Sequence, residues 1–380
     1  MNPLVSIIIP ALNEEDTIGS CLEKVKAGCL KGNISYEIIV VDSSTDATTQ
    51  IAHDMGARII KPMKRGYGNA YLSAFSHANG EIIVIGDADD TYDFTIIPEL
   101  IRPIMENRVD IVIGSRLKGI ILPNSMPWLH QHIGNPLLTW LLNFTFHSGY
   151  SDTHSGMRAI TREALGRLQL HTGGMEFASE MLIEAARRGL IVEEIPIIYY
   201  PRKSPSKLHS FADGWRHIRF ILILRPLRFL ILPGLIFVIT GLLLMGGISF
   251  LRTVELQGLH SFILGDIFML GGLQFLFSGI VMKSYSVTHQ LDDCGPWFSR
   301  VLQYHSLEKM LCLGLLFTGI GFLSGLYIFF SWLSTVGPLM QITNAVLSLT
   351  SVIIGLQIIF TALHMSMMLL WCEHEGCGII

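Results

Sequence analysis

The stretch Glu81-Ile-Ile-Val-Ile-Gly-Asp-Ala-Asp-Asp90 decides the fold class of this chain. Its first half is a short, continuous apolar run rich in β-branched residues, which predicts a strand buried on both faces of a sheet. Its second half is a turn with three aspartates. Such an arrangement is typical of a parallel sheet, where functional side chains follow the carboxyl ends of the strands.

The segments around this stretch repeat an alternation of strand and helix. Further strands are expected at residues 5–9, 37–41, 58–60 and 110–113, and helices at residues 17–30, 45–55, 68–78 and 95–107. Strands that alternate with helices predict a mainly parallel sheet covered by helices on both faces. We therefore expect a soluble α/β domain over residues 1–200.

The C-terminal part has the composition of a membrane domain. Residues 221–380 hold 13 of the 58 Asp, Glu, Lys and Arg residues, and none lies between Met310 and Trp371. A membrane-spanning helix needs about 20 apolar residues. Stretches of that length predict four transmembrane helices, at residues 227–251, 261–281, 311–332 and 342–371, in a domain spanning residues 227–380. This uneven charge and the net charge of −4 exclude a disordered chain, a single soluble globule and a nucleic-acid binder that relies on bulk basicity.

The charged residues between the spans predict the orientation of the chain. The N-terminus has neither the basic segment nor the long apolar core of a signal peptide, so the first domain and both termini are expected in the cytosol. Arg252 then faces outward, while Lys283, Arg300 and Lys309 face the cytosol, as the positive-inside rule requires. Asp266 lies about one turn inside the second span. Either it has a function in the membrane, or it pairs with Arg252 at the interface.

A basic segment at residues 201–226 joins the two domains. Seven basic residues and one acid lie between Pro201 and Arg228. One apolar stripe is expected on a helix here, formed by Phe211, Trp215, Ile218 and Leu222. Such a helix suits the headgroup layer of an anionic membrane. The alternative is a helix that packs on the soluble domain.

Polar side chains follow the expected strands. Asp42 follows the second strand, and Asp87 and Asp89 follow the fourth. Two carboxylates at this spacing can converge on one hard cation, and Mg²⁺ typically takes one or two carboxylates together with phosphate oxygens. No Gly-x-x-x-x-Gly-Lys-Ser/Thr motif occurs, so the phosphates of a nucleotide would have to be held by a metal on carboxylates.

An ordered set of motifs resembles the family 2 glycosyltransferases with the GT-A fold. They are Val5-Ser-Ile-Ile-Ile-Pro-Ala-Leu-Asn-Glu-Glu15, Val41-Asp-Ser-Ser-Thr-Asp46 and Gly86-Asp-Ala-Asp89. Further matches are Gly114-Ser-Arg116, Ser155-Gly-Met-Arg158 and Ile195-Pro-Ile-Ile-Tyr-Tyr-Pro-Arg202. Together they are similar to dolichyl-phosphate mannose and dolichyl-phosphate glucose synthases, over about residues 4–225.

This resemblance implies an inverting, membrane-bound enzyme that moves glucose or mannose from UDP-glucose or GDP-mannose to a polyprenyl phosphate. It implies Mg²⁺ or Mn²⁺ on Asp87 and Asp89. The expected donor-binding residues are Pro10, Asn13, Glu14, Asp42, Arg65, Asp87, Arg202 and Lys207. The expected acceptor-phosphate residues are Ser115, Arg116 and Arg158, and the expected catalytic residues are Asp87, Asp89 and Arg116. The expected partners are the two substrates and the bilayer, without nucleic acid; homo-oligomer formation and the dolichyl or undecaprenyl nature of the lipid stay open.

One residue departs from the pattern of the resembling enzymes. Thr91 stands where some mannose synthases have a Gln near the metal, so a third protein ligand and the choice between Mg²⁺ and Mn²⁺ stay open. A polyprenyl phosphate is already anionic near neutral pH because its second pKa is about 6. The site is therefore expected to position the acceptor and stabilise the leaving diphosphate without a catalytic histidine.

Several candidate residues also have structural explanations. Asp42 and Asp46 can cap the following helix, a frequent role of Asp after a strand. Arg116 can form a structural ion pair, and Arg158 can pair with Glu163. The remaining acids are Asp90 and Asp93, expected to be solvated or capping, and Glu176 and Glu180, which face either the sugar or solvent.

Two other classes of protein join a cytosolic domain to membrane spans. A processive polysaccharide synthase would carry a Gln-x-x-Arg-Trp motif, and this string is absent. A transporter or flippase with a nucleotide-binding domain would need a polar path, and one shallow carboxylate offers little for it. The tail Cys372-Glu-His-Glu-Gly-Cys377 is only a short, metal-like cluster.

Overall fold

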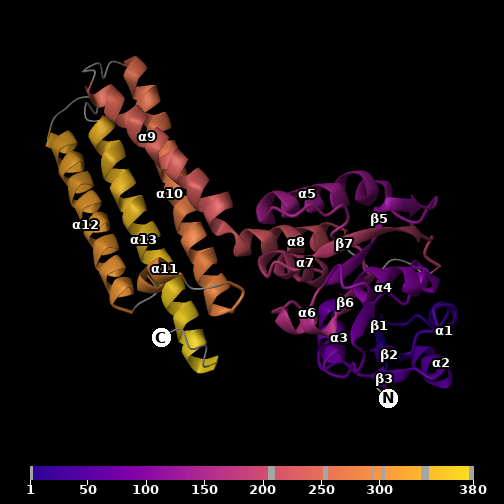
Figure 1. Cartoon of the computed structure of the whole chain (residues 1–380). Helices are drawn as coiled ribbons and strands as arrows, with labels where there is room; N and C mark the ends of the chain where they lie inside the picture. Colours follow the sequence, from indigo (N-terminus) through magenta and orange to yellow (C-terminus); the bar gives the residue numbers. More distant parts are fainter. Residues whose placement is uncertain are drawn as a thin grey trace. The chain divides into compact units, whose positions relative to one another are not determined.

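The computed structural model describes residues 3–203, 210–250, 256–292, 295–301, 304–334 and 342–375. The chain divides into two compact units, Met1–Ile221 and Leu222–Ile380. Figure 1 shows that the first unit contains the strands and the second consists of long helices. Most of the expected joining segment at residues 201–226 thus belongs to the first unit.

The first unit is built on a seven-stranded sheet with the order β3-β2-β1-β4-β6-β5-β7. Its strands are β1 (Val5–Ala11), β2 (Tyr36–Asp42), β3 (Arg58–Ile60), β4 (Ile82–Ile85), β5 (Ile111–Ile121), β6 (Arg158–Thr161) and β7 (Val192–Tyr199). Neighbouring strands are parallel except at β6, which runs antiparallel to β4 and β5. The predicted, mainly parallel sheet is confirmed, and β6 is an addition that the alternation of strands and helices did not indicate.

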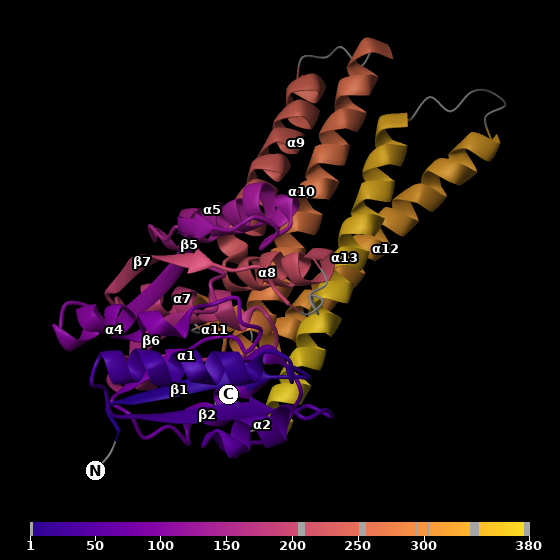
Figure 2. The same cartoon turned by 90° about the vertical axis from the view of Figure 1, so that its right-hand side faces the viewer.

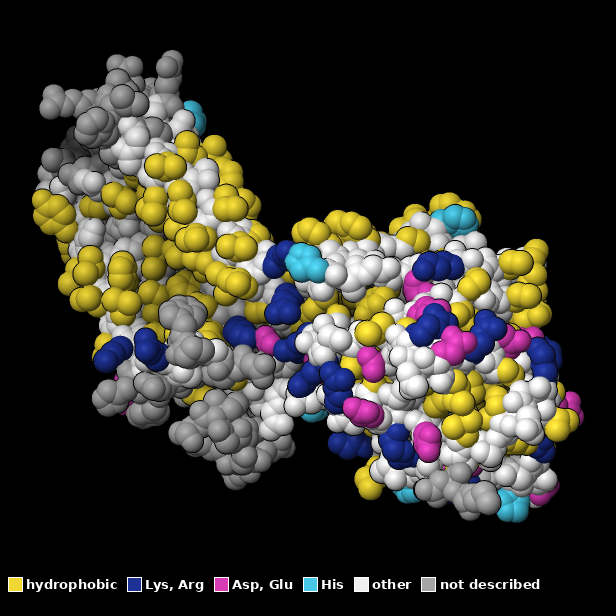
Figure 3. All heavy atoms as spheres, viewed as in Figure 1, with side chains coloured by type: hydrophobic (Ala, Val, Ile, Leu, Met, Phe, Trp, Pro, Cys, Tyr) yellow, Lys and Arg dark blue, Asp and Glu magenta, His cyan; other side chains and the backbone are white. Residues whose placement is uncertain are grey.

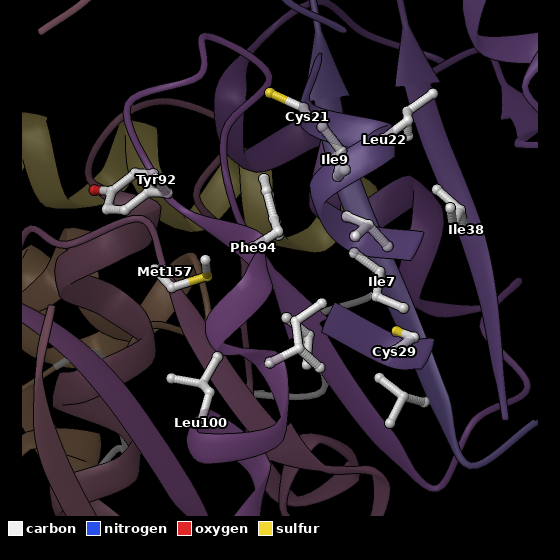
Figure 4. Packing of buried hydrophobic residues seen from close by; sticks show 14 of the residues in the cluster. Ile7, Ile9, Cys21, Leu22, Cys29, Ile38, Tyr92, Phe94, Leu100 and Met157 are labelled. Carbon is white, nitrogen blue, oxygen red and sulfur yellow. The ribbon is translucent and has the colours of Figure 1, made fainter. Parts of the chain in front are cut away.

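Helices cover both faces of this sheet. They are α1 (Ile18–Lys31), α2 (Thr48–Asp54), α3 (Tyr67–Phe75), α4 (Ile97–Met105), α5 (Asn135–Phe146), α6 (Arg162–Arg167), α7 (Phe177–Arg187) and α8 (Ser210–Leu224). Successive residues of β1 enter two separate cores because strand side chains alternate between faces. Ile7 and Ile9 pack with residues of α1 and α4, as Figure 4 shows, whereas Ile8 packs with residues of α3 and α7.

The central position of β4 places the loop that follows it. Both neighbours of β4 are strands, and each of its residues is buried. Gly86 then passes so close to Phe94 that an added Cβ would lie 2.7 Å from the ring. The acidic turn therefore leaves the middle of the sheet at the edge where β1 and β2 also end, because these three strands are parallel.

Helix α8 presents two different faces. His217, Phe220 and Ile221 are buried, and the Ser179 hydroxyl of α7 lies 2.8 Å from His217 Nδ1. Trp215, from the predicted stripe, is 58% exposed. One face of α8 thus packs on the soluble unit, while the face with Trp215 stays accessible for the predicted contact with lipid headgroups. The side chain of Phe211 lies outside the described residues.

The second unit contains α9 (Leu232–Phe250), α10 (Leu256–Thr288), α11 (Pro296–Val301), α12 (Tyr304–Ser334) and α13 (Ile342–Glu375). Its helices include four candidate membrane spans, at Leu227–Gly247, Gly258–Thr288, Ser306–Ser334 and Ile342–Leu370. All four predicted spans are therefore confirmed in position. Figure 3 shows hydrophobic side chains over much of the face of these helices that is in view, which suits contact with lipid.

Candidate active site

The first aspartate of the acidic turn (residues 86–90), Asp87, is held between Tyr67 and Gly156. The Tyr67 hydroxyl, from the first residue of α3, donates a hydrogen bond of 3.0 Å to Asp87 Oδ1. On the other side, Gly156 lies so near that an added Cβ would be 2.6 Å from Asp87 Oδ2. Burial and the neighbouring charge of Asp89 raise the pKa of Asp87 to about 7.

The second aspartate, Asp89, is almost fully buried and has partners on both oxygens. The backbone N–H and the hydroxyl of Thr91 donate to Asp89 Oδ1, over 3.2 Å and 2.6 Å. The guanidinium of Arg202 forms an ion pair with Asp89 Oδ2. Thr91 thus orients the carboxylate of Asp89.

The segment after β7 is fastened to the same acidic turn. Lys203 Nζ lies 2.7 Å from Asp90 Oδ2, and the Tyr200 N–H donates to the Thr91 carbonyl over 3.0 Å. Lys24 Nζ lies 2.6 Å from Asp90 Oδ1. Burial opposes ionisation of Asp90, but these two lysines outweigh it and lower the pKa of the carboxyl. The expectation that Asp90 is solvated or capping is wrong, since the residue is 6% exposed and bridges two segments.

Asp93 has the capping role that was expected. Its carboxylate accepts a hydrogen bond of 3.0 Å from the Thr95 N–H at the start of a short 3₁₀ helix, Phe94–Ile96. Asp46 likewise accepts from the N–H and hydroxyl of Thr48, the first residue of α2. Both acids therefore have structural explanations.

Asp87 and Asp89 suit a hard divalent cation. Hard cations of this kind are bound through one or two carboxylates together with phosphate oxygens and water. Burial is the main cause of the raised pKa of Asp87 and repulsion by Asp89 is the second, and a cation between the two carboxylates would remove that repulsion. No group of three or more His, Cys, Asp or Glu side chains is placed to hold a metal within the described ranges.

Ser115 and Arg116 contact a common loop. The prediction placed them after a strand, but β5 continues to Ile121, so both lie within it. The two oxygens of Asp152 accept from Arg116 Nε and Nη2, each over 2.8 Å, and Ser115 Oγ lies 2.7 Å from Ser151 Oγ. This is the structural ion pair that was the alternative for Arg116.

The ion pair of Arg116 does not use its whole guanidinium group. Burial opposes the charge, but Asp152 outweighs it and keeps the pKa of Arg116 well above its usual value. The group lies over the ring of Tyr199, 5.2 Å from its centroid. Within the described part of the chain Nη1 has no hydrogen-bond partner, so one donor of this permanent cation is not engaged by protein.

Arg158 does not lie where an acceptor phosphate could reach it. It is 1% exposed, and its guanidinium donates to the backbone carbonyls of Thr153, Ser155 and Ala178, over 2.7 to 3.0 Å. This geometry does not support the expected acceptor contact, nor does it show the alternative pair with Glu163. Arg158 instead ties the loop before β6 to α7.

The donor-side candidates gather where β1 and β2 end. Pro10 pairs in register with Val41. Asn13 has a left-handed backbone with φ 51, and its side-chain oxygen accepts from the Thr45 N–H over 2.9 Å. Glu14 follows in the same loop, and its N–H lies 2.9 Å from Thr48 Oγ1.

Asp42 and Arg65 differ in their surroundings. Asp42 is 5% exposed and accepts from the N–H of Ser44 over 2.8 Å and from the hydroxyl of Thr49. Arg65 is exposed, and no contact of its side chain with the other candidates is present among the described residues. Lys207 lies outside the described residues.

Glu180 faces neither solvent nor an open site. It is 2% exposed, and its two oxygens accept from the N–H groups of His171 and Thr172, each over 2.9 Å. Neither expected role of Glu180, contact with the sugar or with solvent, fits this burial. For Glu176, one carboxylate oxygen is buried without a hydrogen-bond partner in the described part of the chain.

Sequence reasoning missed Tyr67 and Asp152, which orient Asp87 and Arg116. Tyr67 stands between Gly66 and Gly68, a Gly-x-Gly pair that lacks the third glycine of a dinucleotide-binding motif. An added Cβ at Gly68 would lie 2.1 Å from the Thr172 carbonyl, so this turn must pack closely against the loop before α7. The glycines thus mark close packing beside the acidic turn, a signal available in the sequence.

Two family models match the chain. The model described as glycosyl transferase family 2 matches residues 6–169, and the model described as glycosyltransferase family 2 C-terminal transmembrane region matches residues 280–369. The chain is 40% identical over 370 residues to the low-salt glycan biosynthesis hexosyltransferase Agl6 of Haloferax volcanii, covering 94% of this chain and 87% of that protein.

Further similar proteins match a smaller share of the chain. A dolichyl-phosphate hexose transferase of Haloferax volcanii is 34% identical over 214 residues, covering 55% of this chain and 89% of that protein. A solved structure of glucosyl-3-phosphoglycerate synthase from Mycobacterium tuberculosis, in complex with Mn²⁺, UDP and glucosyl-3-phosphoglycerate, has a TM-score of 0.49 at 24% identity. That match covers 58% of this chain and 79% of the other.

Proposed function

The chain belongs to glycosyl transferase family 2 as a membrane hexosyltransferase with a GT-A domain, and from this premise we propose the reaction that it catalyses. It transfers glucose or mannose, with inversion, from a nucleotide diphosphate sugar to the phosphate of a polyprenyl lipid at the cytosolic face of a membrane. The second Haloferax relative, a dolichyl-phosphate hexose transferase, supports a dolichyl-phosphate acceptor.

The observation that carries this proposal is the pair Asp87 and Asp89 at the carboxyl edge of the sheet, with Arg202 in an ion pair with Asp89. These two carboxylates would hold Mg²⁺ or Mn²⁺ against the donor diphosphate. When bound, such a cation neutralises charge that builds on the leaving diphosphate. Tyr67 and Thr91 keep the two carboxylates in their orientations.

Arg202 has a second partner available once a donor is bound. Its side chain is 26% exposed, so the pair with Asp89 is accessible to water and exchangeable. A diphosphate beside Asp89 offers Arg202 a bidentate anion in place of the carboxylate. Arg202 then binds the donor, together with Lys207 and Arg65, while Pro10, Asn13, Glu14 and Asp42 line the nucleoside pocket.

The acceptor needs a positive site and no strong base. A phosphate monoester is already anionic near neutral pH, so its oxygen can attack the anomeric carbon without losing a proton first. Arg116, with its unengaged Nη1, directs positive potential toward that phosphate, whereas Ser115 is fully buried and its hydroxyl pairs with Ser151. Arg158 acts through the fold alone.

Helix α5 brings the first unit to the lipid surface. Four large apolar residues at helical spacing are exposed on and just before it, Ile133, Leu137, Trp140 and Phe144, at 47% to 58%. Figure 3 shows hydrophobic side chains gathered over this helix. An amphipathic helix with aromatic residues lies in the plane of the membrane interface, which is where the lipid phosphate is found.

The test incubates membranes that contain the protein with labelled UDP-glucose or GDP-mannose and a polyprenyl phosphate, with EDTA or with Mn²⁺. We expect label in a lipid that mild acid hydrolyses, from one of the two donors, and no label in EDTA. A lipid product that forms equally in EDTA contradicts the metal role. Absence of any lipid product from all donors contradicts the proposed acceptor.

A further inference from the structure

The membrane unit consists of two closely packed helix pairs. An added Cβ at Gly272 of α10 would lie 2.6 Å from the Gly234 carbonyl of α9, and one at Gly355 of α13 would lie 2.6 Å from the Gly314 carbonyl of α12. Backbones approach this closely only where the residues are small. Figures 1 and 2 both show α10 beside α13, so the two pairs meet along these helices.

The contact between α10 and α13 is polar, unlike the glycine contacts within the pairs. Thr350 Oγ1 lies 2.6 Å from Asp266 Oδ1, and Gln357 Nε2 donates to Gln274 Oε1 over 3.0 Å. Asp266 thus has a partner inside the membrane unit, while Arg252, the expected one, lies outside the described residues. Hydrocarbon offers no hydrogen bonds, so these polar groups satisfy one another across the contact between α10 and α13.

These pairs follow one another along the two helices. Gln274 and Gln357 lie near the middle of the spans Gly258–Thr288 and Ile342–Leu370. Toward the N-terminal ends of the two helices, Asp266 lies about 12 Å from Gln274 and Thr350 about 10 Å from Gln357, at a rise of about 1.5 Å per residue. We call the line of polar residues on the facing sides of α10 and α13 the seam.

A cavity opens along the seam. Its volume is about 440 Å³, and the polar side chains that line it are Gln274, Ser278, Gln357, Thr361 and His364. The Oε1 atom of Gln357 is buried and has no hydrogen-bond partner in the described part of the chain. This orphan acceptor needs a donor, and lipid tails have none.

A membrane lipid whose head group donates hydrogen bonds would satisfy this acceptor. Phe277 and Phe360 also line the cavity and suit an apolar chain. An ordinary ligand site has a volume of about 300 to 1,000 Å³, so one sugar ring fits. The phosphate is an anion in both the unglycosylated and the glycosylated lipid, and the lining contains no Lys or Arg, so the difference between the two lipids lies in the hydrogen-bond donors of the hexose. A sugar brings several hydroxyls.

We propose that the seam binds the hexose head group of a glycosylated polyprenyl phosphate and lets it cross the bilayer between α10 and α13. The proposal rests on the proposed function for the identity of the lipid. Each polar pair of the seam contains at least one uncharged side chain. That side chain can exchange its partner for a sugar hydroxyl. The two glycine-packed pairs keep their internal contacts while the seam opens.

The test uses liposomes that contain the purified full chain and a preformed, fluorescent short-chain polyprenyl phosphate hexose. External dithionite bleaches only probe in the outer leaflet, so passage appears as bleaching beyond that fraction. We expect the chain to accelerate passage at least tenfold over empty liposomes. The double variant Gln274→Leu with Gln357→Leu should lose this acceleration, because it removes both partners of the central pair.

Two controls keep the test specific. Tyr327→Leu makes the same kind of change at a residue of α12 that is 70% exposed and outside the seam, and it should retain passage. All three chains are also assayed for hexose transfer in detergent, which the seam variants should change by less than twofold. This second assay detects misfolding and reports on the proposed function separately, since the passage assay uses preformed lipid.

Three results would overturn the proposal. One is passage at the empty-liposome rate with the wild-type chain. Another is equal passage by the wild-type chain and the seam double variant. The third is passage of phosphatidylglycerol and of an unglycosylated polyprenyl phosphate as fast as that of the polyprenyl phosphate hexose, since the seam would then not recognise a hexose.

Discussion

The acidic turn and the β5–β6 region both pair arginine with oxygen, but they do so in different surroundings. Arg202 is 26% exposed and meets Asp89 from a distant segment, whereas the Arg116–Asp152 pair is at most 8% exposed and Arg158 is 1% exposed. An accessible ion pair is screened by water and can exchange partners. A buried cation that loses its partners leaves unpaired groups at high cost. We infer that the acidic turn takes part in the reaction and that Arg158 has a structural role. We call Arg158 and the backbone carbonyls that it holds the frame of the site.

The largest effect is expected from Asp89→Asn. Removing a charge that holds the cation on the diphosphate should reduce hexose transfer about 10³-fold, in the range seen for lost transition-state contacts. The control is Asp93→Asn, because Asp93 only caps a short helix and Asn caps equally well. A fall of the same size in both variants, measured with labelled donor, would remove the distinction between Asp89 and its neighbours.

The frame is tested by Arg158→Met. Three backbone carbonyls lose their donor, at about 1 kcal/mol or more each. At about 2 to 4 °C per kcal/mol, the Tm should fall by about 10 °C. Arg108→Met, at a half-exposed pair with Glu106 and Glu193, should change the Tm by no more than about 2 °C. If the Tm of Arg158→Met is unchanged while hexose transfer is lost, Arg158 binds the acceptor phosphate as expected from the sequence.

A smaller effect on transfer, without loss of stability, is expected from Arg202→Met. The donor loses one charge-assisted contact, so kcat/KM for the nucleotide sugar should fall about 10- to 100-fold. The Tm should move by less than about 3 °C because the pair is accessible to water. Lys203→Met is the matched control, since Asp90 keeps Lys24, and it should cost less than about threefold. A large fall in Tm for Arg202→Met would place Arg202 in the frame.

The smallest effect concerns pH and Asp87. An Asp in the unfolded chain has a pKa of about 3.9, whereas the pKa of Asp87 in the fold is about 7. Between these values the folded state holds a proton that the unfolded chain has released, so this contribution to stability is present below pH 4 and lost as pH rises to 7. Without metal, Asp87→Asn should therefore raise the Tm at pH 8 by a few degrees, about 2 to 4 °C per kcal/mol.

A divalent cation should act in the opposite direction on the wild type. Adding Mn²⁺ at pH 8 should raise its Tm, because the cation relieves the repulsion between Asp87 and Asp89. It should have less effect on Asp87→Asn. Equal Tm shifts in both chains, measured by differential scanning fluorimetry, would show that Mn²⁺ binds elsewhere.

The parts of the fold that could be predicted depend on local patterns. The buried run before Asp87 predicts a strand from its composition alone, and the four spans follow from length and apolarity. The antiparallel strand β6 has only four residues, which are too few for the hydrophobic periodicity to predict a strand.

Side-chain partners in three dimensions could not be predicted in the same way. Whether Arg158 faces a ligand or a backbone carbonyl depends on α7, and its contact with Ala178 lies 20 positions away. The Gln274–Gln357 pair spans 83 positions, so sequence reasoning saw only Asp266 in the membrane. Arg202 was identified through its motif, but its contact with Asp89 required the folded chain.

The most direct test of the account measures Mn²⁺ binding by electron paramagnetic resonance, using the full chain in detergent with UDP or GDP present. We expect one bound Mn²⁺ per chain in the wild type and in Asp93→Asn, with binding at least tenfold weaker in Asp89→Asn. Equal Mn²⁺ affinity in the wild type and Asp89→Asn would contradict the claim that Asp87 and Asp89 hold the ion on which the nucleotide departs.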